Sequence, residues 1–339
     1  MERREIIADL LAKHPDTAIN RIAVIAHSKY GNVFSSFEAA RAAVRYYTGR
    51  KPGDKDKPCS NIIEDNKERA GAKIYSMPKS RAKAWVPYEI EGPCRVGVLS
   101  DIHFPKHDER ALENAVAHLK GKVDVLVLNG DIADAEEFGS WAKSPKAIQT
   151  EDSVQCIRDG LLWLLDQFPD AKVIYKFGNH EERLDRYCWG RAPELVGMPH
   201  ITWEGLLTIG QDLKPIPEMA RIEWVKEQRP IMAGKLPILH GHELPRGLVN
   251  AVNPARGAFL RMIDTVLIGH HHQSSSHVQY NWKHQAINCW SAGCLCDLTP
   301  EYARINKWNH GHAMVEVGKD GQFDVHNFKL LPDGEVVTA

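Results

Sequence analysis

Five short apolar runs constrain the fold of this chain most strongly, because each one is followed almost at once by aspartate, asparagine or histidine. The runs lie at residues 96–99, 123–128, 173–175, 237–239 and 265–268. Helical patterns separate several of them, at residues 111–119, 152–168 and 247–262. This alternation predicts an α/β fold with a largely parallel sheet covered by helices. The alternating, turn-rich stretch after Gln273 predicts antiparallel strands that form a second sheet.

The residues after these runs carry the chemistry. They read Asp101-Ile102-His103, Gly130-Asp131-Ile132-Ala133-Asp134, Gly178-Asn179-His180-Glu181, His240-Gly241-His242 and Gly269-His270-His271-His272. Since the carboxyl ends of parallel strands share one edge, we expect these side chains to meet in one small volume. Carboxylate, imidazole and amide groups are ligands for divalent first-row metals. There are more of them than one tetrahedral ion needs, which indicates two ions bridged by a carboxylate.

The ordered series DxH, GDxxD, GNH[E/D], HG and GHxH resembles the calcineurin-like metallophosphoesterase superfamily, over roughly residues 93–275. The resemblance implies a four-layer αββα sandwich and a phosphoesterase that attacks phosphorus with a metal-bridging hydroxide. It implies two divalent ions such as manganese, iron or zinc. It assigns Asp101, His103 and His272 to the first ion, Asp131 to the bridge, and Asn179, His240 and His270 to the second.

By the same resemblance, His180 binds no metal but protonates the leaving-group oxygen, and Glu181 orients it. Arg183 either makes a forked contact to a substrate phosphate or pairs with Glu182 or Asp185. Asp134 supports its loop, and Asp108 caps the helix that follows it.

Three assignments have alternatives. His242 could replace His240 as a ligand, although the family pattern favours the histidine that ends the strand. The odd member His271 should face away from its neighbours, since adjacent residues of an extended segment point to opposite sides. The cluster formed by Cys289, Cys294 and Cys296 could suggest zinc, but it lacks a paired CxxC spacing, so buried free thiols are the preferred interpretation.

The first 50 residues form a separate helical pattern, with helices expected at residues 3–13 and 18–27 and from Ser35 to near Gly49. Ser35-Ser36-Phe37-Glu38 matches a capping box for the third helix. Arg41 and Arg45 share a face of it, and Arg50 and Lys51 follow. This unit is interpreted either as a helix-turn-helix-like DNA-binding module or as an oligomerisation or docking domain. Residues 51–90 are a charged connector, and residues 91–339 the phosphoesterase domain.

Charge and cysteine content indicate the kind of partner and the cellular compartment expected for this protein. Residues 1–92 carry 17 Lys and Arg against 12 Asp and Glu, net +5, while the rest of the chain carries net −6. A basic leader favours an anionic partner. No apolar window is long enough for a membrane helix, the N-terminus lacks a secretory pattern, and seven scattered cysteines suit free thiols in the cytoplasm. Segments such as 178–184, 252–257 and 294–304 are similar to phage- or prophage-encoded members, which implies a bacterial host cytoplasm.

These features predict a hydrolase that acts on phosphate esters, with a phosphodiesterase or nuclease acting on DNA or nucleotides as the preferred form. Tyr187, Trp189, Trp203 and Trp290 could stack bases or simply pack. The alternatives are a phosphomonoesterase acting on protein or small molecules, and a non-catalytic scaffold. The complete ligand set, including His180, disfavours the scaffold. The sequence makes no prediction of oligomeric state.

Overall fold

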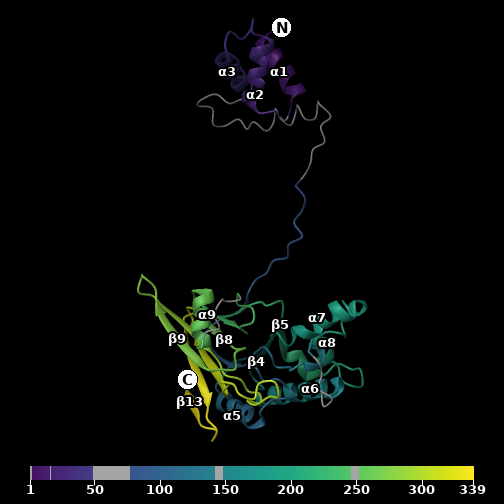
Figure 1. Ribbon diagram of the computed structural model, residues 1–339, viewed down its shortest axis with the longest axis vertical. Coiled ribbons are helices and arrows are strands. Elements are labelled where there is room, and N and C mark those ends of the chain that lie inside the picture. Colours follow the sequence, from purple (N-terminus) through teal and green to yellow (C-terminus); the bar gives the residue numbers. More distant parts are fainter. Residues whose placement is uncertain (1, 16, 49–76, 142–147, 246–251) are drawn as a thin grey trace. The chain divides into compact units, whose positions relative to one another are not determined.

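A computed structural model describes residues 2–15, 17–48, 77–141, 148–245 and 252–339 of the chain (Figure 1). The chain divides into two compact units, residues 1–83 and residues 84–339, which we call the N-terminal unit and the body. Among the described residues, no helix is both long enough and apolar enough to cross a bilayer. Most of the expected connector, together with Arg50 and Lys51, lies outside the described residues.

The N-terminal unit contains three helices of equal length. They are α1 (Arg3–Lys13), α2 (Ile19–Lys29) and α3 (Phe37–Tyr47). Each contributes apolar residues at helical spacing to one small core, among them Ile7, Ile22 and Val44. The third helix begins one residue later than the capping-box pattern predicted: the hydroxyl of Ser36, not Ser35, accepts the N–H of Ala39 at 3.1 Å. Glu38 is consequently free to pair with Arg41, at 3.3 Å.

The body is built on two β-sheets. The first has seven strands in the order β13-β12-β11-β2-β3-β4-β5. Its strands are β2 (Cys94–Leu99), β3 (Val125–Asn129), β4 (Lys172–Lys176), β5 (Ile222–Val225), β11 (Gly311–Val317), β12 (Phe323–Leu330) and β13 (Val336–Thr338). Strands β2 to β5 are parallel, and β11 joins β2 in antiparallel register.

The second sheet has six strands in the order β1-β6-β7-β8-β10-β9. Its strands are β1 (Tyr88–Ile90), β6 (Ile231–Ala233), β7 (Leu236–Leu239), β8 (Val266–Ile268), β9 (Ser275–Tyr280) and β10 (Ala286–Ser291). The inner faces of the two sheets pack against each other through apolar side chains, including Val98 and Val127 from the first sheet and Ile238 and Leu267 from the second.

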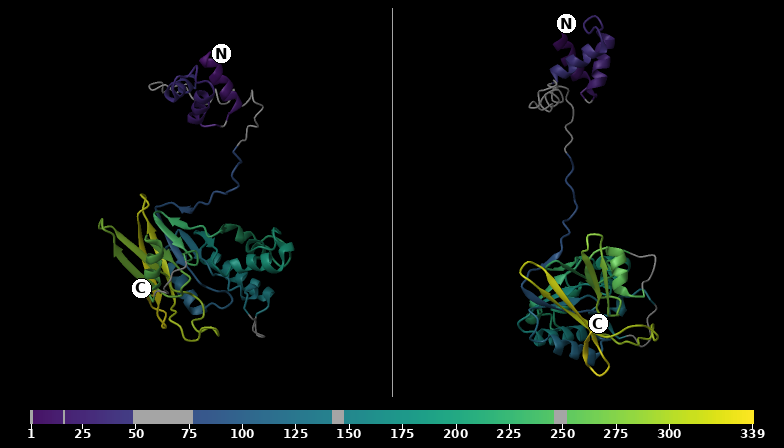
Figure 2. Two further views of the ribbon diagram at one scale, coloured as in Figure 1. Left: turned by 45° about the horizontal axis from the view of Figure 1, so that its top comes forward. Right: turned by 90° about the vertical axis from the view of Figure 1, so that its left-hand side faces the viewer.

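Helices cover both outer faces of this pair of sheets (Figure 2). The helices are α5 (Glu109–Leu119), α6 (Thr150–Gln167), α7 (Glu182–Arg191), α8 (Trp203–Thr208) and α9 (Pro254–Met262), with short 3-10 turns η1 (Glu136–Phe138), η2 (Pro193–Leu195) and η3 (Pro217–Arg221). Helices α5 to α8 pack on the seven-stranded sheet, and α9 packs on the six-stranded sheet. The body is therefore the four-layer αββα sandwich that the sequence predicted.

The sequence assigned strands to sheets incorrectly in two places. The five polar segments were expected at the edge of one parallel sheet, but β7 and β8 belong to the other sheet. The strands after Gln273 were expected to form the second sheet, yet β9 and β10 complete the six-stranded sheet while β11 to β13 extend the seven-stranded one. Strand order along the chain does not reveal this division, because both sheets are assembled from segments distant in sequence.

Candidate metal centre

The five polar segments come together where the carboxyl ends of β2, β3, β4, β7 and β8 meet, across both sheets. Backbone hydrogen bonds join the segments directly. The N–H of His103 donates to the carbonyl of Asp131 at 3.0 Å, and the N–H of Gly269 donates to the carbonyl of His240 at 2.8 Å. The two sheets are joined as well, since the N–H of His270 donates to Oδ2 of Asp101 at 2.9 Å. The relative positions of the segments therefore depend on both sheets.

Among the described residues, four overlapping groups of potential ligand atoms lie here, each with its atoms within 4.8 Å of one another. Two of them join His103 to Asp134 and His180 or to His272 and Cys296, and the other two contain Asp131. Of the two with Asp131, the first consists of Asp101, His103 and Asp131, and the second of Asp131, His240 and His270. His272 lies beside the first group, with Nε2 at 3.2 Å from both Asp101 Oδ1 and His103 Nε2. Asp131 is common to these two groups, as a bridging carboxylate would be.

His240, not His242, is the histidine that faces this centre. Its Nε2 lies 3.2 Å from Asp131 Oδ2, and its ring is fully buried. His242 instead lies 3.0 Å from the carboxylate of Glu182 at the rim. His271 belongs to none of these ligand groups.

The backbone at the centre is unusual. Asp101, His103, Asp131, His270 and His272 all have φ between 52° and 66°, in the left-handed region that residues with a Cβ seldom adopt. Such conformations cost free energy and persist where the surrounding structure enforces them, commonly at functional sites. Five of the seven expected ligands share this feature, which supports a functional role for the cluster.

The donors present fit divalent metal ions. Nδ1 of His240 donates to the carbonyl of Asn129 at 2.8 Å, and Nδ1 of His103 donates to Asp134 Oδ1 at 3.2 Å. Both rings therefore present the Nε2 lone pair to the centre, the arrangement expected of metal-binding histidines. Among the described residues, the buried atoms that make no hydrogen bond include Asp101 Oδ1, Asn179 Oδ1 and His240 Nε2. Buried polar atoms rarely lack partners, so a cation is the simplest occupant.

The electrostatics of the cluster agree with this conclusion. Burial alone would raise the pKa of Asp101, but the charges of His272 and His240 outweigh it and hold the pKa below its ordinary value. The same competition, with His180 and His240, keeps the pKa of Asp131 well below its usual range. Burial would lower the pKa of His240, yet Asp131 and Asp101 raise it to about 10. The carboxylates therefore attract positive charge to this place, which a metal ion could supply instead of a proton.

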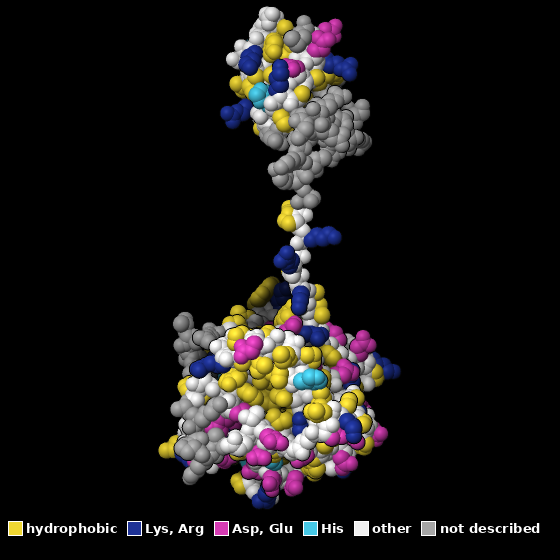
Figure 3. All heavy atoms as spheres, turned by 90° about the vertical axis from the view of Figure 1, so that its right-hand side faces the viewer, with side chains coloured by type: hydrophobic (Ala, Val, Ile, Leu, Met, Phe, Trp, Pro, Cys, Tyr) yellow, Lys and Arg dark blue, Asp and Glu magenta, His cyan; other side chains and the backbone are white. Residues whose placement is uncertain are grey.

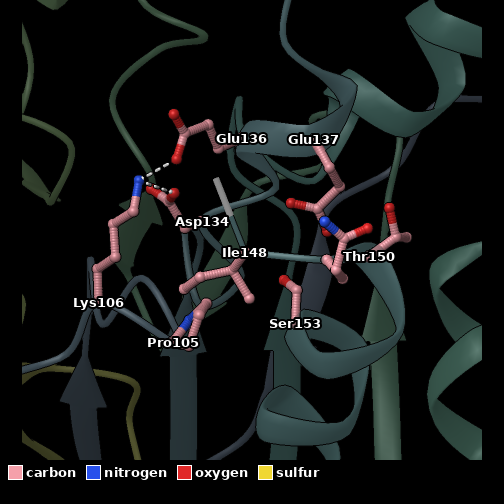
Figure 4. Close-up of a pocket in the computed structure, with 9 residues that line it drawn as sticks. Pro105, Lys106, Asp134, Glu136, Glu137, Ile148, Thr150 and Ser153 are labelled. Carbon is pink, nitrogen blue, oxygen red and sulfur yellow. Dashed lines mark hydrogen bonds and ion pairs between the residues drawn. The ribbon is translucent and has the colours of Figure 1, made fainter. Parts of the chain in front are cut away.

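Asp134, which was expected to support its loop, contacts side chains at the edge of the centre and belongs to a potential ligand group with His103 and His180. It accepts from His103 through Oδ1 and pairs with Lys106 through Oδ2, at 2.9 Å. Lys106 also pairs with Glu136, and these groups border a cavity of about 150 Å³ (Figure 4). Lys106 was not singled out from the sequence, because its partner Glu136 lies 30 residues away.

His180 and Arg183 lie together at the edge of the centre. His180 Nδ1 donates to the carbonyl of Asp134 at 2.6 Å, and one N–H of Arg183 faces its Nε2 at 2.8 Å. Arg183 also donates to the carbonyl of Asp134, and its guanidinium pairs with neither Glu182 nor Asp185. Of the two interpretations of Arg183, the structure therefore favours a contact to a substrate phosphate over an ion pair with Glu182 or Asp185.

The prediction that Glu181 orients His180 is wrong. The carboxylate of Glu181 is fully buried and accepts the backbone N–H groups of Asp131, Ile132, Ala133 and Gly178, together with the hydroxyl of Tyr175. It therefore fixes the loop that carries Asp131, while Asp134 and Arg183 hold the His180 ring. Burial raises the pKa of Glu181, although these hydrogen bonds favour its charged form.

Cys296 is a neighbour of the centre that the sequence analysis placed only among buried thiols. Its Sγ lies 3.8 Å from Nδ1 of His272, and it forms a potential ligand group with His103 and His272. Cys289, Cys294 and Cys296 are all free and buried, as predicted. The CxC spacing was the available signal, but nothing in the sequence indicated that it faces His272.

A model of the calcineurin-like phosphoesterase family matches residues 94–274, and the chain belongs to this family. The match contains all five polar segments. Among solved structures, a single mutant of Vps29 from Entamoeba histolytica is similar, with 12% identity and a TM-score of 0.36, over 72% of this chain and 99% of that chain. No curated protein sequence matches the chain.

Proposed function

We propose that the body is a phosphoesterase that uses two divalent metal ions, such as manganese, iron or zinc, to hydrolyse phosphodiesters of nucleotides or nucleic acid. The observation that carries this proposal is the position of Asp131 in two of the ligand groups. Asp101, His103 and His272 would hold one ion with Asp131, and Asn179, His240 and His270 the other. When bound, such ions acidify water and neutralise charge on the phosphoryl oxygens.

The residues of the chain position the substrate and manage the proton. Arg183 would release the His180 ring and donate its N–H groups to a phosphoryl oxygen, a contact for which its planar fork is suited. Nε2 of His180 would then be free to take up a proton from water, and the protonated ring would give that proton to the leaving oxygen and return to its neutral form. Burial lowers the pKa of His180 to about 3, so the ring is neutral in the free protein. The negative charge of a bound substrate favours the protonated ring.

The setting proposed for this reaction is the cytoplasm of a bacterium, or of a bacterial host where the chain is phage-encoded. The free state of the six cysteines in the described residues supports a reducing compartment.

The experiment is a substrate screen with the full-length protein, stripped with chelator and reloaded with manganese. We expect turnover of bis(4-nitrophenyl) phosphate that depends on metal and exceeds turnover of 4-nitrophenyl phosphate. Elemental analysis should find about two ions per chain. Hydrolysis of the monoester alone would favour the phosphomonoesterase alternative, and loaded protein without activity on either ester would favour the scaffold.

A further inference from the structure

A groove of about 630 Å³ begins at Asn179 and runs along α7. Its floor on the helix side is formed by Arg183, Arg186, Tyr187, Gly190 and Arg191. Their spacing of three, four, seven and eight residues from Arg183 places all of them on one face of the helix. Residues 138–141 form the opposite wall. The groove thus leads directly away from one expected metal ligand.

The groove is cationic on an acidic body. Three arginines line it, and none of its lining residues is Asp or Glu. Arg186 is partly neutralised by Glu182, but the side chain of Arg191 has no hydrogen bond or ion pair to any described residue. Because a helix rises 1.5 Å per residue, the backbone positions of Arg183 and Arg191 are about 12 Å apart along the axis. Cationic groups spread over that length suit an extended chain of anions better than one phosphate.

Aromatic rings lie among these arginines. Trp141 is 80% exposed and Tyr187 is 40% exposed, although both border the groove. Tyr187 packs edge-on against Phe138 at 5.8 Å, and Phe138 packs in the same way against the buried Trp203 at 5.9 Å. The ring of Tyr187 is therefore held firmly, whereas Trp141 offers its face to solvent.

The groove continues past the site where the reaction is proposed to occur. A second cavity, of about 490 Å³, shares Trp141 and Arg183 with the groove and is otherwise lined by Lys106, Asp134, Glu136, His180 and Tyr302. The carboxylates of Asp134 and Glu136 pair with Lys106. A ligand can therefore extend on both sides of a phosphate that lies at His180. The surface of the body around α7 and α8 otherwise carries apolar side chains and charges of both signs (Figure 3).

We infer that this groove binds single-stranded nucleic acid, an inference that rests on the proposed phosphodiesterase function and names its substrate. Arg186 and Arg191 contact phosphates next to the one that is cleaved, and Trp141 and Tyr187 stack on bases. Stacking on exposed aromatic rings combined with a basic track is how proteins hold single strands. A duplex keeps its bases paired and stacked inside, so it cannot use these rings.

The test measures kcat/KM of the full-length, manganese-loaded protein for two substrates, a 12-nucleotide single-stranded oligonucleotide and bis(4-nitrophenyl) phosphate. The ratio of the two values, oligonucleotide over small ester, isolates the contribution of the groove. The variants are Arg191→Ala, Trp141→Ala and Gly190→Leu. A Cβ at residue 190 meets no atom within 4 Å, so leucine fits the fold and fills the groove without changing a charge.

We expect Trp141→Ala and Gly190→Leu to lower the ratio about 5- to 150-fold, mainly through KM, because one stacked base contributes roughly 1–3 kcal/mol. Arg191→Ala should lower the ratio through the loss of one phosphate contact. Arg191→Ala should also flatten the dependence of log KM on log salt by about 0.7, the slope of one phosphate contact on a single strand. Arg191→Lys should restore the salt slope. Arg256→Ala, which removes an exposed arginine from α9, is the matched control and should leave the ratio unchanged.

The outcomes separate this inference from the proposed function. Absence of activity on the small ester as well contradicts the proposed function. Activity on the small ester with an oligonucleotide that is not cleaved, or with a ratio that the three variants do not change, overturns the groove inference alone. If kcat/KM for the oligonucleotide equals that for a single dinucleotide, the groove does not bind an extended strand and the groove inference is wrong. A higher kcat/KM for duplex than for single-stranded substrate also overturns the groove inference.

Discussion

The candidate metal centre of the body and the core of the N-terminal unit are both buried, but their polar groups differ. In the N-terminal unit, Thr48 is the single buried polar residue among those described, and its hydroxyl donates to the carbonyl of Val44 at 2.6 Å. In the body, charged and imidazole side chains are buried together, and several of their atoms lack hydrogen-bond partners. Among the described residues of the N-terminal unit only one buried side-chain atom, Arg41 Nε, lacks a partner, whereas several such atoms cluster in the body. A cluster of unpaired buried polar atoms indicates a ligand.

Among substitutions in the buried polar cluster of the body, Asp131→Asn should reduce activity the most. A neutral amide retains one oxygen but cannot bridge two cations as a carboxylate does, so activity should fall by orders of magnitude, roughly 10³-fold or more. The amide oxygen can still accept the N–H of His180, and the apolar core should keep the protein folded. Metal analysis and diesterase rates measure both effects. Asp166→Asn, at an exposed site on α6, is the control. Two retained ions with near-normal turnover would contradict the bridging role.

His180→Ala should affect catalysis without affecting the metals. Loss of a general acid costs about 10²–10⁴ in rate on a substrate with a poor leaving group. The loss should be much smaller on a nitrophenyl ester, because nitrophenolate departs without a proton. Rates on the two kinds of ester and metal content per chain are the measurements. A similar loss on both esters argues against proton donation, and a lost ion would make His180 a ligand.

Glu243→Gln should affect stability and its dependence on pH. Burial raises the Glu243 pKa, but Lys176, at 2.7 Å, and His242 outweigh it and lower the pKa to about 2. Because the folded pKa is below the unfolded one, this group stabilises the protein above about pH 4.5. The stabilisation, on the order of 3 kcal/mol, is lost as pH falls toward 2.

The variant should therefore have a lower free energy of unfolding than the original chain at pH 7. Between pH 5 and pH 3, the free energy of unfolding should fall less in the variant than in the original chain. Denaturant titrations of the protein with chelator at several pH values measure this change. Glu218→Gln, at an exposed position, should behave like the original chain. An identical acid dependence in the Glu243 variant would show that the pair with Lys176 contributes little.

Removal of residues 1–50 should have the smallest effect on chemistry. Every expected ligand lies beyond residue 100, in the body, so hydrolysis of small esters should persist. If Arg41, Arg45, Arg50 and Lys51 contact DNA phosphates, truncation should weaken DNA binding and reduce the salt slope by about 0.9 per contact on duplex DNA. Gel-shift titrations at several salt concentrations decide this. Unchanged affinity and slope would leave docking or oligomerisation as the role of the N-terminal unit.

The sequence predicted what depends on local pattern. Runs such as 173–175 identified strands, and the polar residues after them could be assigned to one place because strand ends meet there. His240 was preferred over His242 by motif position, and the structure places His240 beside Asp131. Helix periodicity located α1 and α5 within two residues at each end.

The rest depended on contacts between distant segments. The role of Glu181 was misjudged because most of its hydrogen-bond partners are backbone N–H groups of residues 131–133, which have no side-chain signature in the sequence. The sheet to which β8 belongs could not be read from an apolar run of three residues. The groove along α7 was not predicted, because its opposite wall, residues 138–141, is brought there only by the packing of η1.

The glycines that begin two of the polar segments have a consequence for how this family site tolerates mutation. A Cβ at Gly178 would collide with the backbone and carboxylate of Asp131, and one at Gly130, where φ is +82°, would collide with the ring of His240. Neither glycine is expected to touch a metal ion or substrate. In a saturation mutagenesis experiment scored by activity, both positions should nevertheless be as intolerant as the ligands. The number of intolerant positions would therefore overstate the number of residues that perform the chemistry. Some positions would be intolerant only because the strand ends lie too close together to admit a side chain.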